Sequence, residues 1–171
     1  NGIVHDEKTA EEYIKNKIKW NFATTELLSV KLAYESAEAE SLEELEELEE
    51  ILEASRIPME QRDAVRKMGS RFVKTIEKLD LEINKTGIYK EYVTARKGKN
   101  ISHSCVYGVF CSALGIELEE ALEHYLYAQT SAMVTNCVKT IPLSQSEGQK
   151  LLFCLHPLLE EMTEKVNNVP E

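Results

Sequence analysis

The stretch ELEEALEHYLYAQTSAMVTNCVK, from Glu117 to Lys139, decides the fold class. Its apolar residues recur with the period of an α-helix rather than that of a strand, and they form two stripes. The first stripe contains Leu118, Leu122, Tyr125, Ala132 and Met133. The second has the i, i+4, i+7, i+11 spacing of one helical face and contains Tyr127, Ser131, Val134 and Val138. A helix with two apolar stripes either lies in the middle of a bundle or packs a core on one side and a partner on the other.

Helical periodicity continues on both sides of this stretch. Before it, a helix from Ser104 is expected to end at Gly115, since glycine suits a helix C-terminus. After it, Pro142 interrupts the chain, and Ser144 with Glu147 has the spacing of a capping box that opens a last helix.

The first hundred residues are also helical in pattern. Thr9 with Glu12 and Ser41 with Glu44 have capping-box spacing, and Pro58 suits the first turn of a further helix. That helix is expected to place an apolar face opposite a basic stripe. The apolar face contains Val65, Met68, Phe72, Ile76 and Leu79, and the basic stripe contains Lys67, Arg71, Lys74 and Lys78. A short helix is expected over residues 89–95 and a loop over 97–100. The sequence therefore predicts an all-α, single-domain bundle of six or seven helices over residues 1–171.

The charge is concentrated in one segment. The formal net charge is −10, and ten of the 30 acidic residues lie between Glu35 and Glu53, a stretch without lysine or arginine. A sequence pI of about 5.0 excludes nucleic acid as a plausible partner, because phosphate binding needs a basic surface. We interpret the acidic helix mainly as a solvated face, with a patch for a partner protein as the alternative.

Two further classes of protein are excluded by pattern. The longest apolar runs fall short of the roughly 18 residues that a membrane helix needs, and no signal-peptide core is present near the start. Four cysteines without a disulfide framework fit a reducing cytoplasm. We expect Cys111, Cys137 and Cys154 to be buried among apolar residues.

No catalytic, metal-binding or cofactor-binding motif is recognisable. Phosphate-binding loops, the G-x-S-x-G elbow and zinc-ligand spacing are missing from the sequence. The pair Cys154 and His156 offers two ligands to a soft metal, which is a weak motif. His103 precedes a helix, and it serves either as a capping or core residue or as a base or ligand. We predict no enzyme activity, no bound metal and no cofactor.

The stretch CVKTIPLSQSEGQ, residues 137–149, resembles a signature of the UreF family of urease accessory proteins, which reads approximately A-V-R-L-I-P-L-G-Q-x-x-G-Q. The positions that agree with this signature or replace a residue of similar kind are Lys139, Pro142, Leu143, Gln145, Gly148 and Gln149.

Further stretches agree with the same family in the same order. His103 with Gly108 is similar to its H-P-x-x-x-G segment, and Glu60 and Arg62 with Gly69 are similar to its E-L-R…G segment. The agreement from residue 107 to 152 suggests a Helicobacter-type member. Lys139 stands in place of the usual arginine, and Ser144 in place of a glycine. The N-terminal segment and C-terminal tail of the family are expected to be missing from this chain.

The resemblance implies a function without catalysis. UreF-like proteins form homodimers, join the partner UreD (also called UreH) and recruit the GTPase UreG, and the assembly delivers nickel to apo-urease. Control of the GTPase is a further hypothesis for the family. We predict that Tyr127, Ser131, Val134 and Val138 form the dimer face, unless this second stripe is buried within the monomer. The alternatives are a generic helical adaptor unrelated to nickel and a direct nickel-binding protein.

Overall fold

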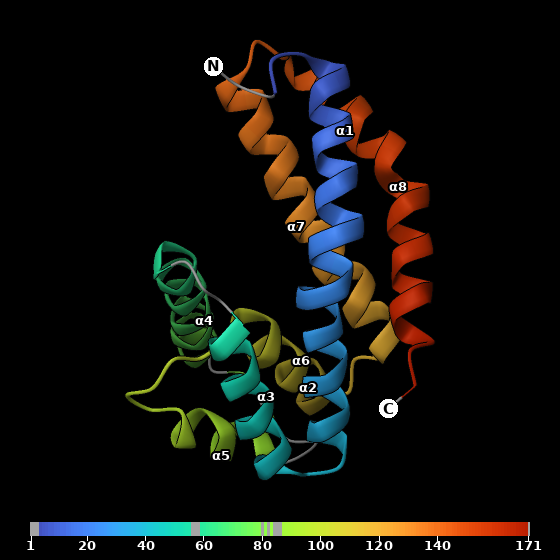
Figure 1. Ribbon diagram of the computed structural model, residues 1–171. Helices are drawn as coiled ribbons and strands as arrows, with labels where there is room; N and C mark the ends of the chain where they lie inside the picture. Colours follow the sequence, from blue (N-terminus) through green and yellow to red (C-terminus); the bar gives the residue numbers. More distant parts are fainter. Residues whose placement is uncertain (1–3, 56–58, 80, 82, 84–86, 171) are drawn as a thin grey trace. The chain divides into compact units, whose positions relative to one another are not determined.

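The fold is known from a computed structural model that describes residues 4–55, 59–79, 81, 83 and 87–170, without the side chains of residues 59–66. All regular secondary structure within these residues is helical. The segments α1 (Glu7–Lys17), the π-helix η1 (Ile18–Leu27) and α2 (Leu28–Glu38) follow one another without interruption (Figure 1). With these three taken as one long helix, the described residues form seven helices, and the predicted all-α class is confirmed.

The remaining helices are α3 (Leu42–Ser55), α4 (Met59–Leu79), α5 (Ile88–Ala95), α6 (His103–Leu114), α7 (Leu118–Thr140) and α8 (Gln145–Asn167). Contacts divide the chain into two compact units. Unit 1 comprises Asn1–Leu28 and Leu122–Pro170, and the residues Ser29–Ala121 belong to unit 2. The predicted single domain over residues 1–171 stays a prediction.

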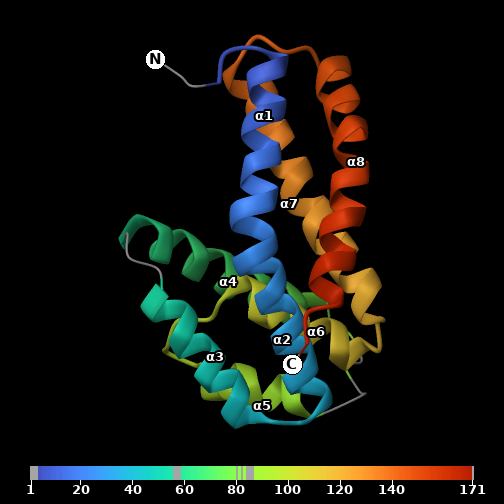
Figure 2. The same cartoon turned by 45° about the vertical axis from the view of Figure 1, so that its right-hand side comes forward.

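Unit 1 is built from α1, η1, most of α7 and all of α8. In Figures 1 and 2, α1 begins at the same end of the unit as the connection between α7 and α8. Within this unit, α8 contacts both α1 and η1. The core between the helices is aliphatic. The fully buried large side chains of this unit are Ile14, Ile18, Leu27, Leu122, Leu126, Leu151 and Leu155.

Unit 2 contains α2, α3, α4, α5 and α6, with α6 in contact with both α4 and α5. One hydrophobic cluster joins all five helices, and Leu45, Tyr92 and Val106 are among its fully buried members. A second, smaller cluster includes Tyr34, whose hydroxyl donates a 2.8 Å hydrogen bond to the carbonyl oxygen of Ile116.

Helix termini follow the predicted capping chemistry at most positions. Ser144 and Glu147 form the predicted capping box at the start of α8, and Gly115 ends α6 in the left-handed conformation, at a φ of 73°. The predicted cap of the first helix, Thr9, was wrong by three residues. The cap is Asp6, whose side chain accepts a hydrogen bond from the Thr9 backbone, because a carboxylate at this position caps better than the threonine hydroxyl would three residues later.

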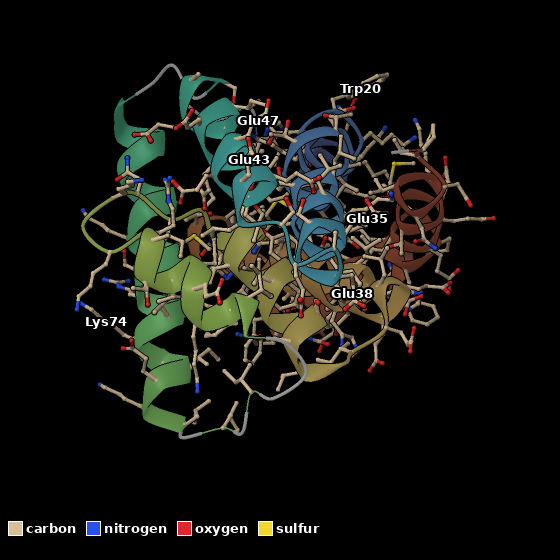
Figure 3. The ribbon with its side chains drawn as sticks, turned by 90° about the horizontal axis from the view of Figure 1, so that it is seen from below. Trp20, Glu35, Glu38, Glu43, Glu47 and Lys74 are labelled. Atoms are coloured by element: carbon tan, nitrogen blue, oxygen red, sulfur yellow. The ribbon has the colours of Figure 1, made fainter. Side chains whose placement is uncertain are left out.

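The buried face of α4 agrees with the predicted one only in part. Ile76 is buried and Phe72 half-buried as predicted, but Val73 is buried as well and Met68 and Leu79 are exposed. The side chain of Val65 lies outside the described residues. The buried side of the helix includes Gly69, which lies against the carbonyl group of Ile101. The basic stripe is exposed as expected, and Lys74 points away from the neighbouring helices of unit 2 (Figure 3). The predicted helix start at Pro58 lies outside the described residues.

Two glycines allow backbones to approach within unit 2. A Cβ atom on Gly69 would lie 2.1 Å from the carbonyl oxygen of Ile101, and one on Gly108 would lie 2.4 Å from that of Val30. Both distances are far below van der Waals contact, and both neighbours are backbone atoms that move only with their helix or loop. The two glycines therefore fix how closely α4 and α6 approach their neighbours.

We expect Gly69→Ala to lower the free energy of unfolding by about 3 kcal/mol, the upper range for forcing an extra methyl into a packed site. Gly87→Ala is the matched control, because the nearest atom to a Cβ there is 3.9 Å away. Its effect should stay within about 0.5 kcal/mol. Urea denaturation followed by circular dichroism measures both. Equal effects of the two substitutions would contradict the close approach at Gly69.

Candidate functional site

The family-like signature forms the helical hairpin of α7 and α8. Gly148 lies on the inner side of α8, where an added Cβ would lie 2.6 Å from Cγ2 of Val138 and 3.6 Å from Cγ1 of Val134. The absence of a side chain at Gly148 thus lets the two helices meet at these valines. Leu143 is half-buried in the connection, where its N–H donates to the carbonyl oxygen of Ile141 at 2.7 Å.

The other signature residues lie on the surface of this hairpin. Lys139 lies in the last turn of α7, Pro142 follows in the connection, and Gln145 and Gln149 occupy the first turns of α8. All four are exposed. The signature therefore combines one packing device at Gly148 with a group of exposed side chains at one end of unit 1. We call these four residues the hairpin surface.

The predicted dimer face is divided by the packing of α7. Val134 is 4% exposed and Val138 is half-buried, and both lie against Gly148 within the chain. Tyr127 is 46% exposed, and Ser131 is partly exposed. The structure thus brings the two valines into the hairpin and leaves Tyr127 as the outward-facing member. Because a single chain does not test an interface between copies, the dimer face stays a prediction.

The other α7 stripe is also shifted from its predicted place. Leu122 and Tyr125 are buried as expected, but Ala132 is exposed and Met133 only half-buried. In the first half of α7 the buried residues are those of the first predicted stripe, such as Leu122 and Tyr125. In the second half they come from the second stripe, because α8 contacts α7 at Val134 and Val138. Periodicity alone does not reveal where such a crossing occurs.

The second group of motif residues lies in unit 2. Gly69 meets the segment before α6, and a Cβ on Gly69 would lie 3.2 Å from the backbone nitrogen of His103. The His103 ring makes edge contacts with Phe72, at 5.5 Å between centroids, and lies 6.3 Å from the Tyr107 ring. Burial lowers the pKa of His103 below its ordinary value of 6.5. His103 is thus a half-buried residue in the first turn of α6 that packs against two aromatic rings, and its predicted role stays a prediction.

Glu60 and Arg62 are the remaining motif residues. They lie in the first turn of α4, and their side chains are outside the described part of the chain.

A buried carboxylate in α3 was missed by sequence reasoning. Glu49 is 1% exposed. It accepts hydrogen bonds from the Ser102 backbone N–H at 2.8 Å, from the Ser102 hydroxyl at 2.7 Å and from the Tyr92 hydroxyl. Arg96 adds a positive charge, with its Nη2 atom 3.9 Å from Oε2 of Glu49. This cluster ties α3 to α5 and to the residue that precedes α6.

Other acids of α3 extend this cluster to the loop that was predicted over residues 97–100. Lys99 pairs with Glu46 at 2.9 Å, and Asn100 donates to Glu53. The interpretation of the acidic helix as mainly a solvated face is wrong at Glu49, which is buried, whereas its other acids are exposed or, at Glu46, half-buried. Its leucine pattern correctly predicted the buried face, but one glutamate lies next to the leucines on that face and shares their burial.

The thiols and imidazoles do not gather into a metal site. Among the described residues, no group of three or more histidine, cysteine, aspartate or glutamate side chains is placed to hold a metal ion. Cys105, Cys111 and Cys137 are buried, but Cys154 is exposed, so the predicted burial of Cys154 was wrong. The reason is that α8 buries Leu151, Leu155 and their helical neighbours, and position 154 faces the other way.

Within the described part of the chain, no helix is long and apolar enough to cross a bilayer.

The described fold and site define an all-α protein whose motif residues shape contacts between helices and an exposed helical hairpin. The chain belongs to the UreF family of urease accessory proteins, because the UreF family model matches residues 4–156. The resemblance read from residues 137–149 is thereby confirmed.

Two relatives illustrate the similarity. The chain is 33% identical over 171 residues to the urease accessory protein UreF of Bacillus sp. (strain TB-90), an alignment that covers 99% of this chain and 74% of the relative. It is 29% identical over 165 residues to the urease accessory protein UreF of Sporosarcina pasteurii, covering 95% of this chain and 80% of the relative. The narrower prediction of a Helicobacter-type member is not tested by these two relatives.

We expect Glu49→Gln to lower the free energy of unfolding by about 2–4 kcal/mol, because hydrogen bonds to a buried charged group are lost or weakened and Arg96 loses its counter-charge. Glu50→Gln, one residue along α3 and exposed, is the matched control and should change stability by at most about 0.5 kcal/mol. Chemical denaturation of the two variants gives the comparison. If both behave like the unmodified chain, the buried cluster does not stabilise unit 2.

Proposed function

We propose that this protein is a non-enzymatic scaffold in urease maturation. In this proposal a homodimer joins UreD/UreH and recruits the GTPase UreG, and the assembly delivers nickel to apo-urease in the cytoplasm, with control of the GTPase as a further role. Membership of the UreF family over residues 4–156 is the observation that carries the proposal. Its relatives bear the name urease accessory protein, which describes a protein that assists an enzyme.

The distribution of motif residues supports a binding role. Buried members such as Gly69, Gly108 and Gly148 have evident packing functions. The hairpin surface has no such function inside the chain, since its four side chains are exposed. Exposed signature residues on a helical hairpin are suited to contact another protein, and we assign the hairpin surface to a partner of the maturation complex.

The proposed dimer contact is centred on Tyr127. Its ring is large, partly apolar and close to half exposed, which is the kind of side chain that contributes most to protein interfaces. Ser131 lies one turn further along α7 and is partly exposed. Val134 and Val138 support this face from behind through their contact with Gly148.

We expect Tyr127→Asp to convert a dimer into a monomer, because moving an unpaired carboxylate into a dry interface costs several kcal/mol. Analytical ultracentrifugation measures the change as a halving of the mass. Tyr13→Asp is the control, since Tyr13 is a tyrosine of similar exposure on α1. An unchanged mass for Tyr127→Asp would remove Tyr127 from the dimer face, and the loss of both dimers would show a general effect of added charge.

The scaffold itself is tested by co-expressing the protein with UreG and UreD/UreH and measuring which partners co-purify. The unmodified chain should retain both partners. Lys139→Glu, a charge reversal in the hairpin surface, should reduce recovery of a partner at least fivefold. Lys165→Glu reverses an exposed charge near the other end of α8 and serves as the control. Failure of the unmodified protein to retain either partner would contradict the scaffold.

The alternatives differ in what they require. A generic helical adaptor would bind other proteins and leave urease activation unchanged when it is deleted. A direct nickel-binding protein would bind the metal tightly and stoichiometrically as an isolated chain, which calorimetric titration would detect. No described group of ligands favours this second alternative.

A further inference from the structure

A pocket lies between α7 and α8 within unit 1. Its volume is about 290 Å³. The walls from α7 are Glu123, His124 and Tyr127, and those from α8 are His156, Leu159, Glu160 and Thr163. The α8 residues follow one another at the spacing of a single helical face, so α8 forms one continuous side of the pocket.

The charge of the pocket walls is negative. Glu123 and Glu160 contribute two carboxylates, and the described lining includes no lysine or arginine. Glu160 lies beside an imidazole of its own helix, with Nδ1 of His156 3.3 Å from its Oε1 atom. When the histidines are neutral, the pocket therefore presents two negative charges that no basic side chain of the described chain balances.

One residue that lines the pocket carries an unsatisfied polar group. Thr163 is 2% exposed and lines the pocket. Its Oγ1 atom has no hydrogen-bond partner among the described groups. A buried hydroxyl without a partner is unusual and costs free energy, and a ligand that donates a hydrogen bond there would remove the cost.

These features select the chemistry of the occupant. A cation is favoured by the two carboxylates, and a group with several N–H donors is favoured by the carboxylate oxygens and the Thr163 hydroxyl. Tyr127 adds an aromatic ring, on which a flat cation stacks well. The guanidinium group has all three properties, because it is permanently charged, planar and weakly hydrated compared with an ammonium group.

We propose that the pocket between α7 and α8 binds the guanidinium group of an arginine side chain supplied by a partner protein. The carboxylates of Glu123 and Glu160 hold the charge from the two helices, and Tyr127 and Leu159 contact its flat faces. The Thr163 hydroxyl accepts one N–H from the bound group. The site concerns a class of side chain, and it does not depend on the partners being those of the urease complex.

The probe for this proposal is N-acetyl-L-argininamide, titrated at pH 8 into the full chain and followed through the imidazole resonances of His124 and His156. A saturable shift is expected. N-acetyl-lysinamide should bind at least threefold more weakly, and N-acetyl-norleucinamide should not saturate. Absence of a saturable shift with the arginine probe, or equal binding of the lysine or norleucine probe, would overturn the proposal.

Two matched double variants test the carboxylates. Glu123→Gln with Glu160→Gln should raise the dissociation constant of the arginine probe at least tenfold. Glu161→Gln with Glu164→Gln removes the same charge from exposed positions on α8 outside the pocket and should change it less than twofold. Equal weakening by both pairs would mean that the probe responds to overall charge, which contradicts a site.

Thr163→Val tests the hydroxyl alone, because valine has nearly the shape of threonine but lacks the hydroxyl. It should weaken binding of the arginine probe severalfold without destabilising the free chain, because the hydroxyl it removes has no partner there. Unchanged affinity would exclude Thr163 from the site. Sedimentation of the same samples reports the oligomeric state separately, so a failure of the proposed Tyr127 dimer is distinguishable from a failure of the pocket.

Discussion

The buried carboxylate of Glu49 is the interaction on which the arrangement of unit 2 depends most. It connects three separate pieces of chain. Glu49 belongs to α3, Tyr92 belongs to α5, and Ser102 is the residue before α6. A charge withdrawn from water is tolerated only where hydrogen bonds and an opposite charge replace the solvent, and Arg96 supplies that charge. Burial raises the pKa of Tyr92, so its hydroxyl remains a donor to the carboxylate. The start of α6, and with it His103, is positioned by this cluster.

The residues shared with the UreF family have a physical explanation in the closeness of helices. Gly69, Gly108 and Gly148 each lie where an added Cβ would collide with a neighbouring segment. Two of these collisions involve backbone, and the third involves a branched side chain of α7. The family signature thus includes positions at which only hydrogen fits, together with exposed residues that the packing does not require. The first kind defines the fold, and the second kind is available to partners.

The surface of unit 1 offers two adjoining features on α7. Tyr127 belongs both to the proposed dimer face and to the wall of the acidic pocket, whereas the hairpin surface lies at the end of the helix pair. A scaffold that assembles several proteins needs contacts of different chemistry. An aromatic side chain, two carboxylates that line a pocket with Thr163, and a group of exposed polar residues differ in this way on one helical hairpin.

The sequence by itself determined the helical class, most helix limits, the capping of α8 and the family, because periodicity, capping and motif spacing are local properties of the chain. It did not reveal the burial of Glu49, the exposure of Cys154 or the place where α7 turns its second stripe toward α8. Each of these depends on which face of a helix meets which neighbour, and that choice is made by contacts between residues far apart in sequence. Glu49 differs from the exposed Glu50 only in the direction in which it points, and the tertiary structure alone supplies Tyr92, Arg96 and Ser102 to receive it.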